Sequence, residues 1–330
     1  MNPTTSESKG IKLSSTPKFS IVICTYNQAE ALRNSLESIN NSKDVTHSDI
    51  ELLVIINNCT DNTLEICSKF ENVSAFPFKY ITEKEQGLSY ARNRGIKESI
   101  GEIIIFTDDD VVVPDHWLSA ILTTYETDRP DCVFGKILPD WRNHKPEWFS
   151  PPMSPAYALL DYGDKKLNIN TIDKEFFGAN FSMKKSILED IGGFNVELGR
   201  KGEQLFIGEE TQIFKHLIKC KKVVIYNPNA FLFHVIHENR KSKRFIKKYY
   251  KDIATSIALM TFHSEGKKFL GVPHYKIKEL ILLFSSIFLN ITHLISKKDT
   301  PALFLMQLKL KLQLRVLYLC VINTLRWSRN

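Results

Sequence analysis

Apolar runs alternate with helix-like patterns along the first 107 residues of the chain. Four short runs are apolar or β-branched over most of their length, at residues 19–24, 51–56, 78–83 and 102–107. Between them, apolar residues recur at helical spacing, at Ala29, Leu32, Leu36 and Ile39, then at Leu64, Cys67 and Phe70, and a third helical stretch covers residues 86–99. Because the runs are apolar throughout rather than alternating, this order predicts an α/β fold with a mostly parallel sheet covered by helices on both faces.

Polar clusters follow three of the four predicted strands. They are Thr25-Tyr26-Asn27, the stretch from Asn57 to Thr63, and Asp108-Asp109-Asp110. In open α/β sheets, ligands bind outside the carboxyl ends of the strands. We therefore expect the three clusters to converge on one crevice.

The pattern changes after about residue 130. A stretch rich in Pro and Trp (141–155) indicates an ordered loop that crosses the surface, and VVIYNP (223–228) predicts one more strand. Between them, GEETQ (208–212) is followed by a helical pattern through Phe214, Leu217 and Ile218.

The C-terminal third is basic and apolar. Residues 240–251 hold seven basic residues and no acid, and Phe245, Tyr249, Ile253 and Ile257 recur every four positions. Such an amphipathic helix suits an anionic bilayer surface, or it packs on the domain with a solvated basic face; nucleic acid is the weaker interpretation. Residues 280–296 carry no charge, but they are short for a membrane span and contain Asn290 and His293, so a re-entrant, interfacial or hairpin arrangement competes with a span.

Composition restricts the class of protein without identifying it. The 330 residues are 43% hydrophobic and 25% charged, as in ordinary globular proteins, and the net charge of +7 argues only weakly for an anionic partner. The six cysteines form no C-x-x-C pair, which disfavours a zinc or redox site. The polar N-terminus lacks the apolar stretch of a signal peptide, so we expect residues 1–17 to be disordered and the protein to be cytoplasmic.

The aspartate triplet is the first candidate for chemistry. Asp108 and Asp110 stand two residues apart at the end of a strand, so in extended geometry their side chains share a face while Asp109 points the other way. Hard divalent cations prefer such oxygen ligands. If the triplet is considered alone, a solvated turn explains it equally well.

Several motifs, in order, resemble glycosyltransferase family 2. They are the strand and loop from Ser20 to Asn27, NNCTDNT (57–63), GLSYARNRG (87–95), TDDD (107–110), GANFSMKK (178–185), GGF (192–194), GEET (208–211) and AFLFH (230–234). The resemblance covers roughly residues 19 to 245. It implies a GT-A fold, a nucleotide-sugar donor that is usually a UDP-sugar, Mn²⁺ or Mg²⁺, and inversion at the anomeric carbon.

The resemblance also implies an organisation and a cellular role. Residues 18–240 would form the catalytic domain, with a nucleotide-sugar half (18–115) and an acceptor half (116–240). The basic and apolar pattern of residues 241–330 predicts a helical extension, for which membrane association is one of the interpretations given above. The acceptor would be a glycan or a lipid-linked glycan in surface polysaccharide synthesis at the inner face of the cell membrane.

Individual site residues follow from the matched motifs. Glu209 and Glu210 are the candidate catalytic bases; Glu210 is favoured, although this pair is Glu-Glu where the family commonly has Glu-Asp, and both acids also suit the first turn of a helix. Asp108, Asp110 and His234 are the expected metal ligands. The expected donor-binding residues are Thr25, Tyr26, Asn27, Asn57, Asn58, Asp61, Arg92, Asn93, Asp108 and Asp109. Many relatives have Asp where this chain has Ile56, so a contact to the base or ribose falls to Asn57, Asn58 or Asp61.

Two other functions compete with glycosyl transfer. A sugar-phosphate nucleotidyltransferase would have a glycine-rich, basic loop after its first strand, but that loop here is TYNQAE. A non-catalytic nucleotide-sugar or glycan-binding protein has no need for the retained aspartates and glutamate pair.

Overall fold

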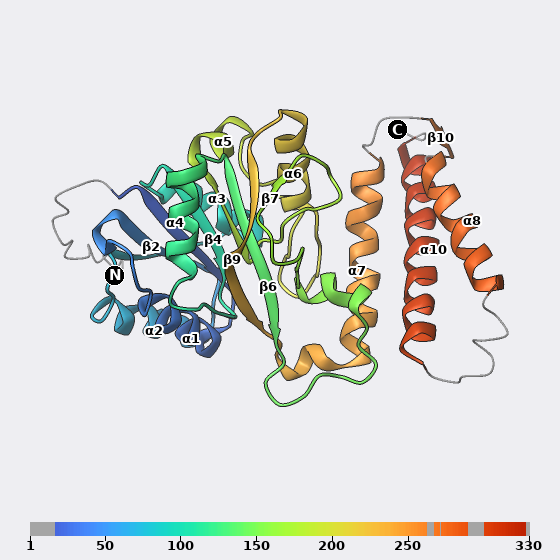
Figure 1. The fold of residues 1–330 in the computed structure, drawn as a ribbon. Coiled ribbons are helices and arrows are strands. Elements are labelled where there is room, and N and C mark those ends of the chain that lie inside the picture. The colour runs from blue at the N-terminus through green and yellow to red at the C-terminus, as the bar shows by residue number, and fades with distance from the viewer. Residues whose placement is uncertain (1–16, 263–266, 271, 290–299, 328–330) are drawn as a thin grey trace.

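The computed structural model describes residues 17–262, 267–270, 272–289 and 300–327. Its centre is a large mixed sheet in the order β3-β2-β1-β4-β8-β6-β9-β5, with β7 paired to β9 (Figure 1). The predicted disorder of residues 1–17 falls almost wholly outside the described residues. We refer to residues 18–240 as the sheet region.

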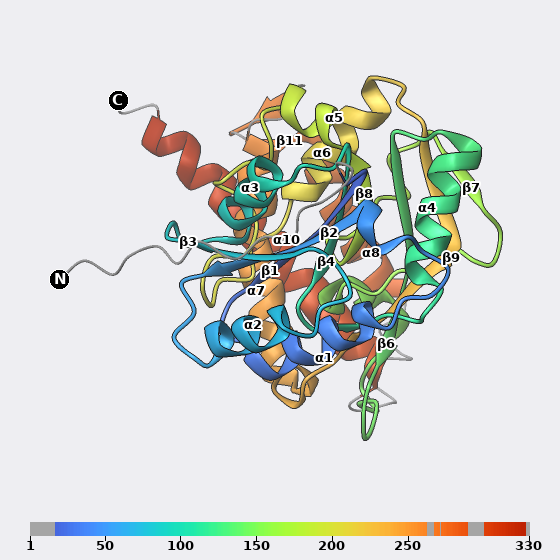
Figure 2. The same ribbon diagram turned by 90° about the vertical axis from the view of Figure 1, so that its left-hand side faces the viewer.

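The first half of the sheet is parallel, as predicted. Its strands are β1 (Phe19–Thr25), β2 (Ile50–Asn57), β3 (Phe78–Glu83) and β4 (Ile103–Asp108), and β1 lies between β2 and β4 with Phe19 opposite both Ile50 and Ile103. Every residue of β2 is buried, which is why the predicted run is apolar throughout. Helix α3 (Leu88–Glu98) covers one face of these strands, and α1 (Ala29–Asn40) and α2 (Thr63–Glu71) cover the other (Figure 2).

The second half contains antiparallel pairs that local patterns did not predict. Strand β8 (Asn180–Lys184) runs antiparallel to both β4 and β6 (Cys132–Asp140), whereas β9 (Val224–Val235) runs parallel to β6. The predicted strand 223–228 is only the first part of β9. The short strands β5 (Val111–Val112) and β7 (Leu167–Ile169) also pair antiparallel with β9.

The pairing of β5 with β9 has a consequence for function. It places Val111 opposite His234, and the Val235 N–H donates to the Asp110 carbonyl at 2.8 Å. Residues more than 120 positions apart are thereby fixed side by side. The remaining elements of the sheet region are η1 (His47–Asp49), α4 (Trp117–Asp128), η2 (Pro151–Tyr157), α5 (Lys185–Asp190), α6 (Glu209–Lys219) and η3 (Glu238–Lys241). The predicted loop 141–155 accordingly ends in the short helix η2.

Among the described residues, three long helices follow the sheet region: α7 (Lys243–Phe262), α8 (His274–Leu289) and α10 (Pro301–Trp327) (Figure 1). The small hairpin of β10 (Lys268–Phe269) and β11 (Val272–Pro273) lies between α7 and α8. The apolar stripe predicted in α7 packs against protein, because Tyr249 and Ile253 are buried. Packing, rather than bilayer contact, therefore accounts for that stripe.

The described helices show no membrane span. None of them combines the length and apolar character needed to cross a bilayer. Residues 280–289 lie in α8, while residues 290–296, including Asn290 and His293, lie outside the described residues.

Gly135 makes the close approach of β6 and β9 possible. It lies at an irregularity in their pairing, and a Cβ placed there would stand 1.7 Å from the Ala230 carbonyl oxygen. That contact is with backbone, which cannot move aside without disturbing the sheet. Asn180 bridges the same strands by donating to the carbonyls of Lys136 and Ala230 at 2.8 and 2.7 Å.

We expect Gly135→Ala to lower the free energy of unfolding by about 1–3 kcal/mol or more, the usual cost of overpacking a core. Urea denaturation measures the change. Val73→Ala, at an exposed side chain, is the control and should change stability by less than about 0.5 kcal/mol. Equal stability of the Gly135→Ala variant and the wild type would show that the strands do not approach this closely.

Candidate functional site

The acidic triplet lies at the carboxyl end of β4, in the turn that leads to β5. Asp110 is buried and Asp108 partly exposed. Ligand atoms of Asp108, Asp110 and His234 all lie within 4.8 Å of one another. The structure thus brings together the three residues that the sequence predicted as metal ligands.

The orientation of His234 suits it to hold a cation. Its Nδ1 lies 2.6 Å from the Tyr157 carbonyl oxygen, a contact that places the ring proton on Nδ1 in neutral imidazole. Its Nε2 faces the Asp110 carboxylate at 2.9 Å, where a protonated ring donates to the carboxylate. A divalent cation can replace that proton between Nε2 and the carboxylate, so this donor set fits Mn²⁺ or Mg²⁺.

The charges of the triplet are crowded. Burial, followed by the charge of Asp110, raises the pKa of Asp108 and, more strongly, that of Asp109. Burial also acts against ionisation of Asp110, but His234 and Arg240 outweigh it and hold the pKa of Asp110 below its usual range. One ionised carboxylate beside two that resist ionisation is an arrangement that a divalent cation relieves.

Arg240 belongs to this cluster, although its sequence context gave no specific signal. Its Nη1 donates to Asp110 Oδ2 at 3.1 Å and lies 3.2 Å from His234 Nε2. The guanidinium is buried at η3, just before α7. In the sequence it appears only as the first residue of a basic run, where surface positions are the common expectation.

Arg92 connects the acidic triplet to the glutamate pair. Its guanidinium, 2% exposed, lies 3.0 Å from a carboxylate oxygen of Glu209 and 3.0 Å from one of Glu210. Its other terminal nitrogen lies 3.9 Å from Asp108. The candidate bases and the candidate metal ligands therefore belong to one cluster of side chains, bridged by a single side chain from α3.

The two glutamates differ in their surroundings. Burial, followed by the charge of Glu210, raises the pKa of Glu209 well above its usual range. Burial also acts to raise the pKa of Glu210, but the charge of Arg92 outweighs burial, and the pKa of Glu210 is lowered. The side chain of Glu210 is also more exposed, at 17% against 3%. Glu210 is thus the ionised and reachable member of the pair.

The helix-capping explanation for the pair holds as well. Glu209 and Glu210 form the first turn of α6, after Gly208, and no side chain caps this end of the helix. Acids are favourable at such a helix end. The helix therefore presents both carboxylates to Arg92 without excluding a chemical role.

Gly178, the first residue of the GANFSMKK motif, makes room for this arrangement. A Cβ there would stand 1.9 Å from Arg92 Nη2 and 2.4 Å from Glu210 Oε1. Sequence analysis singled out the motif but not this glycine. The structure identifies it as the position that lets Arg92 and Glu210 meet.

The first two polar loops hold each other in place. Asn27, which has a left-handed φ of 53°, accepts from the Thr60 N–H at 2.7 Å, and Asp61 accepts from the Ala29 N–H at 2.9 Å. Next to Asn27, Thr25 is buried at the end of β1, and Tyr26 is 40% exposed. These two loops converge as predicted. The side-chain oxygens of Asn27 and Asp61 accept hydrogen bonds that hold one loop against the other.

The other predicted donor-binding amides also have protein partners. Asn57 donates to the carbonyls of Glu83 and Glu85 and accepts from the Gly87 N–H, and Asn58 donates to the Lys84 carbonyl. Asn93 forms a two-way pair with the backbone of Phe194, at 2.9 and 2.7 Å. These side chains fix the loops around the cleft, and direct donor contact by them stays a prediction.

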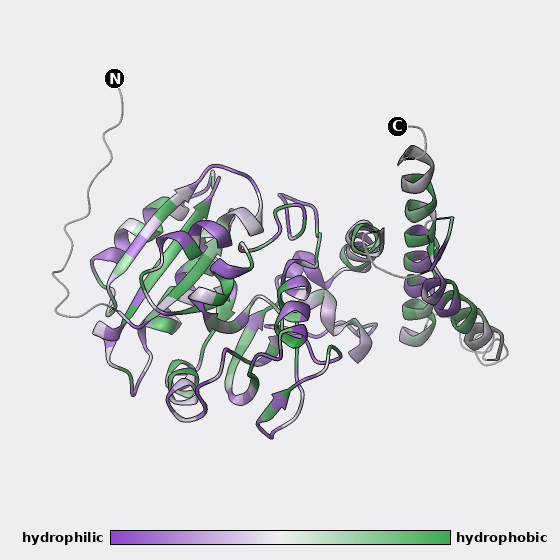
Figure 3. Ribbon diagram, turned by 90° about the horizontal axis from the view of Figure 1, so that it is seen from above, coloured by the Kyte–Doolittle hydropathy of each residue, from purple (hydrophilic) through white to green (hydrophobic). Residues whose placement is uncertain are grey.

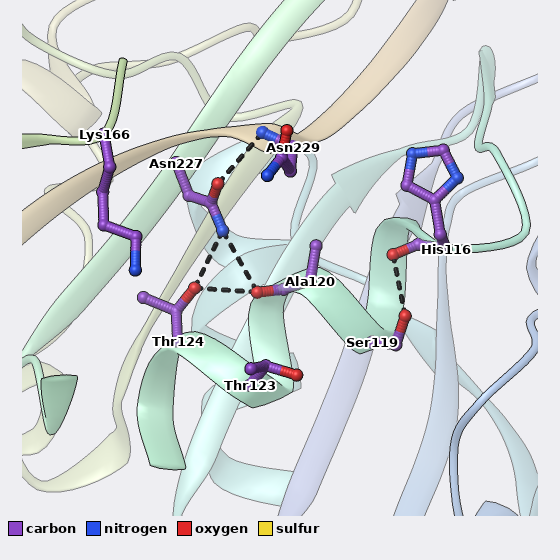
Figure 4. Close-up of a pocket in the computed structure, with 8 residues that line it drawn as sticks. All are labelled: His116, Ser119, Ala120, Thr123, Thr124, Lys166, Asn227 and Asn229. Atoms are coloured by element: carbon purple, nitrogen blue, oxygen red, sulfur yellow. Dashed lines mark hydrogen bonds between the residues drawn. The ribbon is translucent and has the colours of Figure 1, made fainter. Parts of the chain in front are cut away.

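A separate polar hollow of about 350 Å³ lies between α4 and β9 (Figure 4). Its lining includes His116, Lys166 and Asn227, and Asn227 donates to Thr124 Oγ1 at 2.8 Å. It contains none of the predicted site residues, so the candidate chemistry belongs to the cluster of side chains around Arg92.

Comparisons with known proteins give a consistent result. The family model described as glycosyl transferase family 2 matches residues 20–192, a little over half of the chain. A relative from Haloferax volcanii named glucosyl-dolichyl phosphate glucuronosyltransferase is 25% identical over 227 residues, which cover 68% of this chain and 71% of that protein.

Solved structures share the fold. The mannosyltransferase PcManGT from Pyrobaculum calidifontis, in complex with GDP-Man and Mn²⁺, has a TM-score of 0.60 at 16% identity and covers 96% of this chain and 89% of its own. Residues 1–349 of TarS from S. aureus, in complex with UDP-GlcNAc, have a TM-score of 0.56 at 17% identity. The match covers 76% of this chain and 68% of the TarS chain. The curled, mostly parallel sheet with flanking helices is the GT-A fold, and the chain belongs to glycosyltransferase family 2.

Proposed function

We propose that this glycosyltransferase is inverting and metal-dependent, and that it moves a sugar from a nucleotide-sugar donor, UDP-sugar in the first instance, to a glycan or lipid-linked acceptor. The observation that carries this is the bridge of Arg92 from Glu210 to Asp108. It puts a base candidate and a metal-ligand set in the same cleft, as in-line displacement at a sugar–diphosphate bond requires.

The chain's own residues have distinct roles in this proposal. Asp108, Asp110 and His234 would hold Mn²⁺ or Mg²⁺, which when bound stabilises negative charge on the departing nucleoside diphosphate. Glu210 accepts the proton from the attacking acceptor hydroxyl, and Arg92 keeps Glu210 ionised and oriented. Glu209 positions Arg92 from the buried side.

Similar proteins indicate the classes of donor and acceptor. Solved structures of this fold hold UDP-GlcNAc in one case and GDP-Man in another, so UDP- and GDP-sugars are the donors to test. The name of the Haloferax volcanii relative specifies a dolichyl phosphate-linked acceptor, which supports a lipid-linked acceptor here. Such acceptors would place the enzyme at the inner face of the cell membrane.

We expect Glu210→Gln to slow the hydrolysis of the donor by about 10²–10⁴-fold, the usual contribution of a general base. The measurement is nucleoside diphosphate release from UDP- and GDP-sugars with Mn²⁺. Glu209→Gln is the matched control and should have a smaller effect, because Glu209 is the less exposed and less ionised partner.

Binding of UDP to both variants, measured by calorimetry, shows whether the cleft is intact. Full activity of Glu210→Gln would remove Glu210 from its assigned role. Bound nucleotide without turnover in the wild type would favour a non-catalytic binding protein instead.

We also expect EDTA to abolish donor hydrolysis and added Mn²⁺ to restore it in the wild type but not in Asp110→Asn, since Asp110 is the ionised ligand of the set. Electron paramagnetic resonance of bound Mn²⁺ provides a readout independent of activity. Asp115→Asn, at an exposed aspartate paired with Lys43, is the control and should bind Mn²⁺ as the wild type does. Equal Mn²⁺ affinity of all three proteins would place the cation elsewhere.

A further inference from the structure

A largely apolar cavity of about 600 Å³ lies where α7, α8 and α10 meet the sheet region. This volume is within the range of about 300–1,000 Å³ that is usual for ligand sites. Its apolar lining includes Ile207, Tyr249, Ile253, Leu282, Leu283 and Leu312. Together with Pro155 and Ala156 of η2, five chain segments that are distant in sequence thus form one hydrophobic groove.

The groove lies directly beside the catalytic loop. Ile207 precedes Gly208, after which Glu209 and Glu210 open α6. The Ile207 N–H donates to Ser256 Oγ of α7 at 3.0 Å, so the loop is tied to the wall of the groove. The side chain of Tyr249 lines the groove, and its hydroxyl donates to the Pro155 carbonyl at 3.3 Å.

The helices around the groove are strongly cationic. Together α7, α8 and α10 hold eleven lysines and arginines but only two acids, Asp252 and Glu279. Both acids are paired, Asp252 with Lys248 and Glu279 with Lys276. Lys309, which is exposed, lies at the groove itself, as does Glu279, whose charge is paired with Lys276. A ligand with an apolar chain and an anionic head matches this combination.

The outer face of α8 continues the apolar surface. Ile281, Leu282 and Phe284 are exposed, although α8 carries lysines one to two turns earlier. Figure 3 shows hydrophobic residues along α8 and α10 beside polar ones. Since none of the described helices spans a bilayer, this face offers contact with lipid at a membrane surface rather than within its core.

We propose that the groove binds the hydrocarbon chain of a polyprenyl phosphate-linked acceptor and so delivers the acceptor's head group to Glu210. The inference rests on the function proposed above, because it names the acceptor class of the same site. The lining includes Ile207, which stands directly before the loop that opens α6, so a head group attached to a chain in the groove would lie near Glu210.

Farnesyl phosphate is a suitable soluble probe, and calorimetry with the full chain is the measurement. We expect farnesyl phosphate to bind at least tenfold more tightly than inorganic phosphate, with a negative heat-capacity change from apolar burial. Equal affinity for farnesyl phosphate and inorganic phosphate would overturn the proposal, because the hydrocarbon chain would then contribute nothing to binding.

Two positions on α8 give a matched pair of variants. Leu283→Glu places a charge in the groove and should weaken farnesyl phosphate binding at least tenfold, whereas Ile281→Glu, exposed and outside the lining, should change it less than twofold. Leu282→Gln, at an exposed lining position, tests the groove with little risk to folding and should weaken binding severalfold. Equal losses in Leu283→Glu and Ile281→Glu would indicate adsorption to a surface and contradict a groove.

Two further arms separate the alternatives. Dihexanoyl phosphatidylglycerol should bind at least tenfold more weakly than farnesyl phosphate; comparable affinity would make the groove a general lipid contact and overturn the proposal. Glu210→Gln should bind farnesyl phosphate as the wild type does while losing donor hydrolysis, so failure of the groove and failure of the active site give different results.

Discussion

The structure of the site depends on one buried cation. Arg92 is almost completely enclosed, and three carboxylates, those of Glu209, Glu210 and Asp108, lie within 4 Å of its guanidinium. Removing one partner from such a buried cluster costs about 3–5 kcal/mol, because uncompensated charge remains in the interior. The cluster therefore fixes α3, α6 and the end of β4 relative to one another. Gly178 is the glycine that leaves space for it.

The Arg92 guanidinium also gives the two adjacent glutamates different protonation behaviour. The pKa of Glu209, which is the more deeply buried, is raised, and the pKa of Glu210 is lowered by Arg92 despite burial. A proton held on one member of a close carboxylate pair leaves the other ionised, which is the state that a general base needs. The aspartate triplet shows a similar difference. His234 and Arg240 lower the pKa of Asp110, whereas burial and the charge of Asp110 raise the pKa values of Asp108 and Asp109.

Local sequence patterns predicted the parts of the structure that local physics determines. The four apolar runs became the parallel strands, and the carboxyl ends of those strands brought their polar loops together. Asp108, Asp110 and His234 were found through motifs, but their contact depends on β5 pairing with β9, a long-range register that no local period encodes. Arg240 and Gly178 were missed for the same reason. Donor contact by Asn57, Asn58 and Asn93 stays a prediction, and the structure adds that their amides bond to backbone, which a sequence does not reveal.

The central claim is that the cation site and Glu210 face one donor across the Arg92 bridge. A crystal of the full chain grown with Mn²⁺ and UDP tests it most directly, through the anomalous signal of manganese. We expect one strong peak among Asp108, Asp110 and His234, with the diphosphate of UDP on the side of the cleft that Glu210 faces. A manganese peak away from these three residues, or UDP bound on another surface, would contradict the account.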